Sequence, residues 1–341
     1  MYSFNNDYSE GAHPKILEAI TRTNLVQNGG YGMDEHCNRA REIIRQEIGR
    51  EDADVHFIVG GTQTNLITIG TALRPWQAVI CVAQGHINVH ETGAIEATGH
   101  KVLAMPGKDG KLTPDDIIQA LDYHTDEHMV QPKMVYISNS TETGTQYTKA
   151  ELESLHHLCR EKELYLFLDG ARLGSALTSP VNDLAMKDIA ALTDVFYIGG
   201  TKAGALFGEA LVISHPELKP DFRFMVKQRG ALLAKGWLLG IQFEELFTDG
   251  LYYELASHSN DMAKILREGI KDCGYSFASP AFTNQLFPIF PEAVIKTLQK
   301  DFVFSIQEKG EERSVIRLVT SWATSKEECG HFLSVLKTCS I

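Results

Sequence analysis

The sequence predicts an α/β fold, with a large domain built on a seven-stranded, mainly parallel sheet and a smaller C-terminal α/β domain. The chain has 341 residues, which is more than one average domain needs. It is 43% hydrophobic and 22% charged, as is ordinary for a folded protein. Its first two thirds alternate short apolar runs with helical patterns. Continuous runs such as MVYIS and LYLFLD are typical of strands that are buried on both faces.

Seven such runs predict the strands of the large domain. They are Val55–Gly60, Ala78–Ala83, Lys101–Met105, Lys133–Ser138, Leu164–Asp169, Asp194–Gly199 and Ala210–Ser214. Helices between them have recognisable starts. Thr113 followed by Pro114 predicts one helix N-terminus, and Thr148 with Glu151 predicts a capping box at another.

The pattern changes near Phe224, where a long helical stretch is expected to run to about Asp272. A last helix is predicted to begin at Ser325. We therefore expect an N-terminal segment over residues 1–14, a large domain over 15–245 and a small domain over 246–341. The strand-like pieces of the small domain are Gln285–Phe290, Phe302–Ser305 and Val315–Val319.

Charge and cysteine content exclude several classes of protein. With 32 basic and 44 acidic residues the net charge is −12, whereas binders of nucleic acid or anionic membranes need a cationic face. No apolar run approaches the roughly 20 residues that span a bilayer, and the start MYSFNNDYSEGAHPK lacks a secretory pattern. Six cysteines without a CxxC pair predict free thiols, with Cys81, Cys159 and Cys329 in the core. We expect an acidic cytoplasmic protein without a metal site.

Two charged residues follow predicted strands of the sheet. Asp169 ends a buried strand, and open α/β sheets bind ligands at the carboxyl ends of their strands. Lys202 follows another strand within GGTKAG, where small neighbours would allow close approach by something flat or bulky. A lysine made neutral by its surroundings is a nucleophile for Schiff-base chemistry. The alternatives are an aspartate that caps a turn and an ordinary loop lysine.

Two further stretches have residue types suited to ligand binding. Gly60-Gly61-Thr62, between a strand and a helix, offers backbone N–H groups and a hydroxyl to a phosphate, although its glycines also suit a plain turn. His86 follows the second strand, with His90 and Glu91 after it. A metal site at the two histidines lacks a clear third ligand. A His86 that stacks on a planar ring or acts as a base is the other interpretation.

Together, a phosphate cradle, an imidazole, a strand-end carboxylate and a lysine fit pyridoxal 5'-phosphate (PLP). This cofactor needs a lysine for covalent attachment and a carboxylate that keeps its pyridine nitrogen protonated. The sequence therefore predicts PLP bound covalently to Lys202.

The chain resembles the fold-type I PLP enzymes, and more narrowly the low-specificity L-threonine aldolase group of the β-eliminating lyase family. The resemblance covers essentially the whole chain. It implies an aspartate-aminotransferase-like, three-layer large domain and an aldehyde-lyase of amino acid metabolism. Such an enzyme cleaves the Cα–Cβ bond of β-hydroxy-α-amino acids, such as threonine or allo-threonine, into glycine and an aldehyde. The motifs are Asn6-Asp7-Tyr8-Ser9, Tyr31-Gly32, Gly61-Thr62-Gln63, Gln84-Gly85-His86, Glu91-Thr92-Gly93-Ala94, Asp169-Gly170-Ala171-Arg172-Leu173, Thr201-Lys202 and Arg317-Leu318-Val319-Thr320-Ser321-Trp322.

The resemblance also implies residue roles. Lys202 and His86 are the catalytic residues, and His86 stacks on the cofactor ring. The cofactor-binding residues are Gly61, Thr62, His86, Asp169, Arg172, Thr201 and Lys202, and those that bind the substrate are Ser9, Arg172 and Arg317. A planar, bidentate arginine is well suited to a carboxylate.

One stretch departs from the family pattern. Many members carry a histidine after the fourth strand, where this chain reads SNSTETG with Thr141 near that place, so His86 or water held by it is the expected base. The resemblance further implies a homodimer or homotetramer with shared sites, in which the basic stretch Lys227–Lys235 reaches a neighbouring subunit's phosphate. Alternatives left open are a PLP-dependent β-eliminating lyase or aminotransferase acting on another amino acid, and a non-catalytic protein of this fold.

Overall fold

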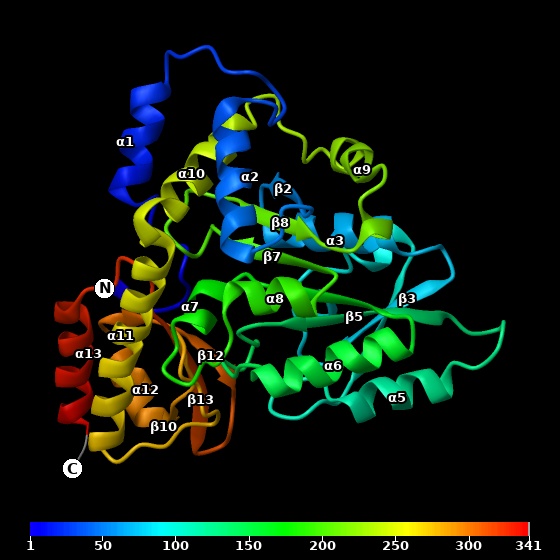
Figure 1. The fold of residues 1–341 in the computed structure, drawn as a ribbon. Helices are drawn as coiled ribbons and strands as arrows, with labels where there is room; N and C mark the ends of the chain where they lie inside the picture. Colours follow the sequence, from blue (N-terminus) through cyan, green and yellow to red (C-terminus); the bar gives the residue numbers. More distant parts are fainter. Residues whose placement is uncertain (340–341) are drawn as a thin grey trace.

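The computed structural model describes residues 1–339 and confirms the seven strands of the large domain (Figure 1). The last two residues of the predicted small domain, 340 and 341, lie outside the described residues. The strand order is β2-β8-β7-β6-β5-β3-β4. The bounds are β2 Asp54–Ile58, β3 Gln77–Val82, β4 Lys101–Met105, β5 Gln131–Ser138, β6 Tyr165–Asp169, β7 Val195–Gly199 and β8 Glu209–Ile213.

The strand directions place one edge of this sheet in position to bind a ligand. Only β8 runs antiparallel to its neighbours, β2 and β7, and the other pairs are parallel. The carboxyl ends of β2, β3, β5, β6 and β7 therefore meet at one edge. After β3 the chain places β4 on one side of it and β5 on the other. Such a reversal of strand order opens a crevice at the carboxyl ends of the strands.

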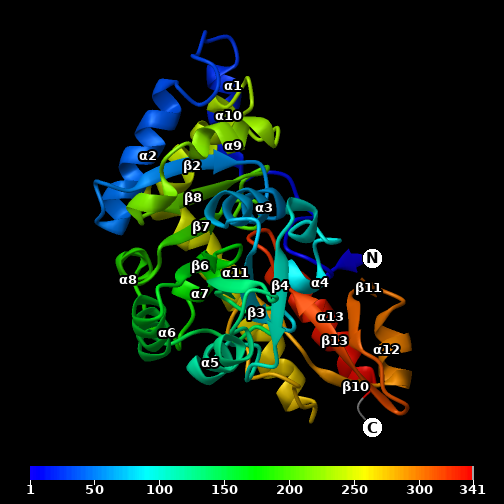
Figure 2. The ribbon, with the colours of Figure 1, turned by 90° about the vertical axis from the view of Figure 1, so that its right-hand side faces the viewer.

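Helices cover both faces of the sheet, which gives the three-layer arrangement (Figure 2). One face packs against α2, α5, α6, α8 and α10, and the other against α3, α4 and α9. Alternate residues of each strand enter the two cores; Val135 and Ile137 of β5 face one and Met134 and Tyr136 the other. The helices of this domain are α1 Pro14–Thr23, α2 Glu35–Ile48, α3 Gly61–Ala72, α4 His86–Val89, α5 Pro114–Tyr123, α6 Lys149–Glu161, α7 Leu173–Leu177, α8 Met186–Leu192, α9 Phe222–Gln228 and α10 Trp237–Phe247, with short 3-10 turns at Glu96–Thr98, Pro216–Leu218 and Thr248–Gly250.

The helix starts read from the sequence are confirmed, but the long helix is not continuous. Thr113 and Thr148 each form a capping box, the first with Asp116 and the second with Glu151. The stretch expected as one helix from Phe224 to Asp272 is divided into α9, α10 and α11. A turn with Asp249 and Gly250 at positive φ separates α10 from α11, because left-handed residues cannot continue a right-handed helix.

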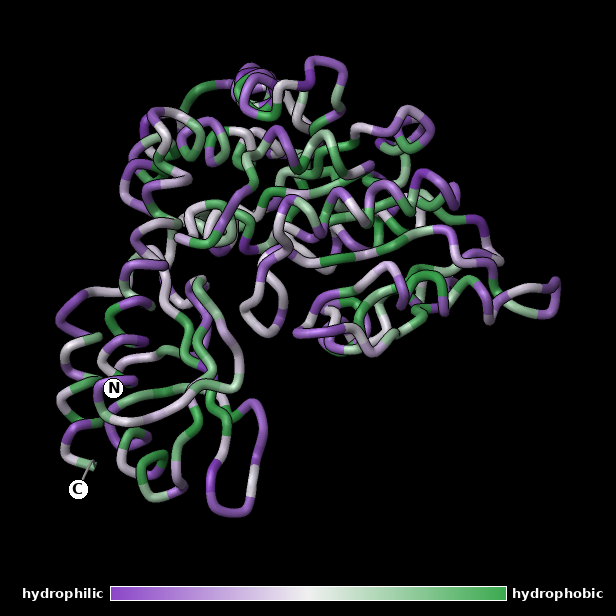
Figure 3. Tube along the Cα trace, turned by 60° about the horizontal axis from the view of Figure 1, so that its bottom comes forward, coloured by the Kyte–Doolittle hydropathy of each residue, from purple (hydrophilic) through white to green (hydrophobic). Residues whose placement is uncertain are grey.

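The small domain packs its own core against α11 (Leu251–Asp272) and forms a separate lobe in Figure 3. Its centre is β13, which pairs antiparallel with β9, β10 and β12. The first residues of the N-terminal segment join this core, because β1 pairs with β11 and Phe4 is fully buried there, whereas Ala12 packs in the core of the large domain. The other bounds are β1 Tyr2–Ser3, β9 Gln285–Leu286, β10 Ile289–Pro291, α12 Glu292–Leu298, β11 Phe302–Val303, β12 Ser305–Glu308, β13 Arg313–Val319 and α13 Lys326–Thr338.

All six cysteines are free thiols, and the three expected in the core are fully buried. Among residues 1–339, none of the helices has the length and hydrophobicity that crossing a membrane would require.

Candidate active site

Asp169 and Lys202 extend from neighbouring strand ends of the sheet. Asp169 is the last residue of β6 and is 5% exposed. Its carboxylate accepts hydrogen bonds from the Tyr136 hydroxyl and, at 3.0 Å, from the Ala171 backbone N–H. Lys202 follows β7, which lies beside β6. Because both strands end at the same edge, the structure brings these two sequence-predicted residues together.

The surroundings of Lys202 make its ammonium easier to deprotonate. Burial and the charge of Arg172 lower the pKa of its ammonium, against the opposing charges of Asp7, Asp169 and Glu209. Burial in turn raises the pKa of Glu209. A lysine with a lowered pKa has the free electron pair that covalent attachment to an aldehyde needs.

Asp7 is a site residue to which the sequence analysis assigned no role. Its carboxylate is 1% exposed and holds Arg172 through two hydrogen bonds, from Nε at 2.7 Å and from Nη2 at 3.0 Å. It also accepts a hydrogen bond from Asn284 Nδ2 at 2.9 Å. Burial opposes ionisation, but Arg172 and Lys202 outweigh it and lower the pKa of Asp7. Arg172 is therefore fixed in orientation from the N-terminal segment.

A hydrogen-bonded chain joins the imidazole to the strand-end carboxylate. His86 Nδ1 lies 2.7 Å from Glu91 Oε1, and Asn65 Nδ2 donates to the same oxygen at 2.7 Å. Asn65 Nδ2 also lies 3.4 Å from Asp169 Oδ2. Burial opposes protonation of His86, but the bond to Glu91 and the charge of Asp169 prevail and raise its pKa. The ring is thus held in one orientation and favoured as a cation.

The first turn of α3 offers an anion cradle. It begins after Gly60, and no side chain in the described chain caps its N-terminus. The Thr62 side chain is exposed. A Cβ added at Gly61 would lie 3.1 Å from the Tyr197 hydroxyl, so this backbone approaches the core closely. Free N–H groups and a hydroxyl at a helix N-terminus suit a phosphate.

Arg317 projects from β13 of the small domain towards the same region. Its Nη2 donates to the Asn5 carbonyl at 3.4 Å, and its buried Nε has no partner within residues 1–339. Burial and the charge of Arg172 lower its pKa. Ser9 lies at the surface, where its hydroxyl donates to Asn6 Oδ1 at 3.0 Å. Arg317 therefore has a free donor for an anion, whereas the Ser9 hydroxyl donates to a neighbouring side chain.

The surroundings of Lys202 differ in part from the sequence interpretation. The Thr201 hydroxyl donates to Glu209 Oε1 at 2.9 Å and accepts from the Gly208 N–H at 3.0 Å. A Cβ at Gly200 would lie 2.8 Å from Phe243, and one at Gly204 would lie 2.6 Å from Leu255. At these two glycines the close approach is therefore made by bulky side chains of the protein itself, Phe243 and Leu255.

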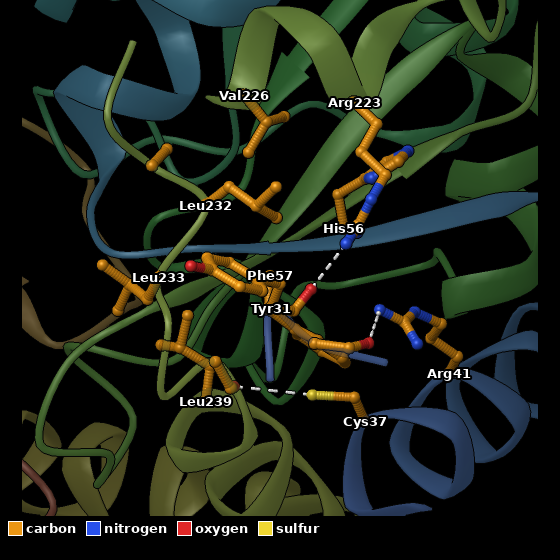
Figure 4. Close-up of a pocket in the computed structure, with 13 residues that line it drawn as sticks. Tyr31, Cys37, Arg41, His56, Phe57, Arg223, Val226, Leu232, Leu233 and Leu239 are labelled. Atoms are coloured by element: carbon orange, nitrogen blue, oxygen red, sulfur yellow. Dashed lines mark hydrogen bonds between the residues drawn. The ribbon is translucent and has the colours of Figure 1, made fainter. Parts of the chain in front are cut away.

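A separate small cavity lies away from these residues (Figure 4). Its volume of about 20 Å³ suits one water molecule. Arg223 and Arg41 border it, and they donate to the backbone carbonyls of Tyr31 and Gly32, each at 2.7 Å. None of the predicted site residues lines it. The hydrogen bonds from Arg223 and Arg41 hold the loop that carries Tyr31.

The residues at the sheet edge fit PLP. The cradle of α3 is open to a phosphate, and the pKa of Lys202 is lowered. Asp169 is placed to hold a proton on a ring nitrogen, and the Nε of Arg317 lacks a partner in the described chain. The sequence analysis assigned no role to Asp7, Asn65, Tyr136 and Asn284; the only signal for Asp7 was its place in the Asn6-Asp7-Tyr8-Ser9 motif. Glu91 was noted without a role.

Comparisons with known proteins agree with this geometry. The chain matches the family described as "Beta-eliminating lyase" over residues 9–292. It is 31% identical over 334 residues to a low specificity L-threonine aldolase of Pseudomonas aeruginosa, covering 95% of this chain and 94% of that protein. A second relative of the same description, from a Pseudomonas species, is 31% identical over 302 residues.

Solved structures give the same picture. A structure described as Leishmania major threonine aldolase superposes with a TM-score of 0.99 and 58% identity, covering 100% of both chains. A Thermus thermophilus aspartate aminotransferase superposes with a TM-score of 0.76 at 17% identity, which supports the aspartate-aminotransferase-like fold. The chain belongs to the β-eliminating lyase family.

Proposed function

We propose that this chain is a PLP-dependent lyase that cleaves the Cα–Cβ bond of β-hydroxy-α-amino acids of the threonine type to glycine and an aldehyde. The observation that carries the proposal is that Lys202, whose pKa is lowered, lies beside the strand-end Asp169. The threonine aldolases among the relatives support the substrate class.

The proposed roles follow from the contacts described above. Lys202 attaches PLP, and Asp169 holds a proton on the ring nitrogen. When bound, PLP supplies an electron sink for the pair released at Cα. His86, oriented by Glu91, stacks on the ring, and the N-terminus of α3 with Gly61 and Thr62 binds the phosphate.

The substrate carboxylate is assigned to Arg317, whose buried Nε lacks a partner within the described residues. Arg172 donates two hydrogen bonds to Asp7. We therefore propose that it lies beside the bound substrate carboxylate and near an oxygen of the cofactor. Ser9 is a proposed contact of the substrate and Thr201 of the cofactor. The Ser9 hydroxyl donates to Asn6 and the Thr201 hydroxyl to Glu209, so each would have to share or exchange its partner.

Two experiments test the function. Purified protein loaded with PLP should show an absorbance band at about 420 nm, and Lys202→Ala should lose that band. Incubation with threonine, allo-threonine and phenylserine should release aldehyde and glycine. Release of ammonia with a keto acid, or transfer of the amino group, would instead identify another PLP reaction.

We also propose a homo-oligomer with shared sites in the cytoplasm. Apolar side chains are exposed on α1, on the loop after it and on α9: Leu17, Leu25, Val26, Tyr31, Met33 and Phe224. Lys227 lies 4.8 Å from the centre of the Tyr31 ring, and Arg229 is exposed beside it, which gives this surface basic groups for a partner's phosphate.

Subunit complementation tests the sharing of sites. If Lys202→Ala and Arg229→Ala are each inactive because they damage different halves of a shared site, mixed oligomers should regain part of the activity. Independent sites would give no recovery. Light scattering gives the number of subunits, and cell fractionation tests the compartment.

A further inference from the structure

The segment that follows β5 holds an unusual concentration of buried polar atoms. Both amide atoms of Asn139, the Ser140 hydroxyl and Glu142 Oε2 are buried without a partner in the described chain. Native proteins pair nearly all such atoms, and exceptions mark catalytic groups or places for water and ligands. This segment lies at the sheet edge that carries the candidate active site, because Asn139 donates its N–H to the Asp169 carbonyl at 3.0 Å.

Glu142 is the acidic residue of this segment, and one of its oxygens is fixed. Glu142 Oε1 accepts from the backbone N–H of His86 at 3.0 Å and from the Ser138 hydroxyl at 2.8 Å. His86 begins α4, and Ser138 ends β5 in register with Asp169. The carboxyl group is therefore held against the residue that we assign to the cofactor ring, while the buried Oε2 has no hydrogen-bond partner within residues 1–339.

Charges from several elements act on this carboxyl group. Burial and the charge of Asp169 raise the pKa of Glu142. The charge of Glu142 in turn helps to raise the pKa of Arg172. The raised pKa makes Glu142 a stronger base than an exposed glutamate at neutral pH. The titratable groups that act on it or respond to it are Cys81, Tyr136, Tyr147, Asp169 and Arg172.

Other groups near this place are less suited to accept a proton. His86 Nδ1 is engaged with Glu91, and its raised pKa favours the protonated ring. The Thr141 hydroxyl lies 3.1 Å from the Thr143 hydroxyl and 2.7 Å from that of Thr145. Of these candidates, Glu142 combines a free oxygen with an available electron pair.

We propose that Glu142 is the general base that takes the proton of the substrate β-hydroxyl, an inference that rests on the proposed lyase function. The hydroxyl proton moves to Glu142 Oε2, and the O–H pair forms the carbonyl π bond of the aldehyde. The Cα–Cβ bond breaks and its pair remains with Cα, which PLP chemistry accommodates. Cα then takes up a proton from another donor to give glycine, and Glu142 returns its own proton to water.

Glu142→Gln tests this role, because the amide keeps an oxygen for His86 and Ser138 but cannot take the proton. We expect kcat for threonine-type substrates to fall by roughly 10²–10⁴-fold with a small change in KM. The acidic limb of the kcat–pH profile should disappear. Exchange of the glycine Cα hydrogen in heavy water needs no β-hydroxyl and should continue, as should the absorbance of bound PLP.

A second readout uses the chain without PLP. Because the pKa of Glu142 is raised in the folded state, stability should fall as the pH rises from its unfolded value of about 4.3 through the folded pKa. Glu142→Gln should remove that part of the pH dependence, as measured by chemical unfolding. The matched control Ser138→Ala removes one bond to Oε1 and leaves the base, so its loss of kcat should be far smaller.

The outcomes separate the two proposals. If the wild type cleaves threonine-type substrates and Glu142→Gln cleaves them at a similar rate, Glu142 only caps α4 and the inference fails. If the wild type exchanges glycine hydrogens but releases no aldehyde from any β-hydroxy amino acid, the proposed function fails and the inference fails with it.

Discussion

Replacing Asp7 by asparagine should destabilise the protein far more than the same change at the surface. Asp7 accepts two hydrogen bonds from Arg172 and one from Asn284, and its side chain is fully buried. An asparagine would turn a donor towards at least one of these donors and leave the guanidinium without its counter-charge. Breaking a buried pair in this way costs about 3–5 kcal/mol.

The exposed pair Arg50–Asp52 provides a matched control. Its geometry is similar, with donor–acceptor distances of 2.8 and 2.9 Å, but Asp52 is 62% exposed. Pairs of this kind contribute about 0–1 kcal/mol. At roughly 2 °C per kcal/mol for a chain of this length, Asp7→Asn should lower Tm by about 6 °C or more and Asp52→Asn by about 2 °C at most.

The pH dependence of this loss has a defined sign. The pKa of Asp7 is lowered in the folded state, so its stabilisation is complete above the unfolded pKa of about 3.9 and is lost as the pH falls through the folded pKa. The difference in unfolding free energy between wild type and Asp7→Asn should therefore shrink below about pH 4. Equal losses for Asp7→Asn and Asp52→Asn in urea unfolding at neutral pH would refute the reasoning.

Three further predictions concern the imidazole, the strand ends and the carboxylate site. Glu91→Gln should lower the pKa of His86 in an NMR titration. It should also reduce the stability below about pH 6.5, because a histidine with a raised folded pKa contributes stability there. An unchanged His86 pKa would mean that Glu91 does not raise it. Gly170→Ala should prevent soluble expression, because its Cβ would lie 1.9 Å from the Tyr197 carbonyl oxygen; a folded variant by circular dichroism would contradict this. Arg317→Ala should raise KM for amino acid substrates by roughly 10–100-fold with a smaller effect on kcat, because a charge-assisted hydrogen bond is lost. An unchanged KM in steady-state kinetics would contradict this assignment.

Local patterns predicted the parts of the site that lie next to strands. Asp169 and Lys202 could be found because each directly follows a continuous apolar run, and such runs predict buried strands whose ends meet. Asp7 could not be found in this way. Its partners Arg172 and Asn284 lie 165 and 277 residues away along the chain, and no periodicity links them.

The same limit applies to Glu142 and to the long helix. The neighbourhood of Thr141 was identified from the sequence, but only the folded backbone shows that Glu142 reaches the His86 N–H. The helical stretch after Phe224 has an apolar pattern with no proline, and its two interruptions contain residues with positive φ: Gly230 after α9, and Asp249 with Gly250 after α10. Periodicity reports which face is buried, but it does not fix φ at a single residue.

The place of the N-terminal segment has a consequence for the order of folding. β1 pairs with β11, and the Asn5 carbonyl meets Arg317 across 312 residues of sequence. Contacts between such distant segments form slowly, because most of the chain must already be compact before they can close. In the large sheet, the pairing of β2 with β8 closes about as long a loop as the contact of Asp7 with Arg172. Asn284 and Arg317 reach the N-terminal segment only across 277 and 312 residues, so we expect the carboxylate site to become ordered late in folding.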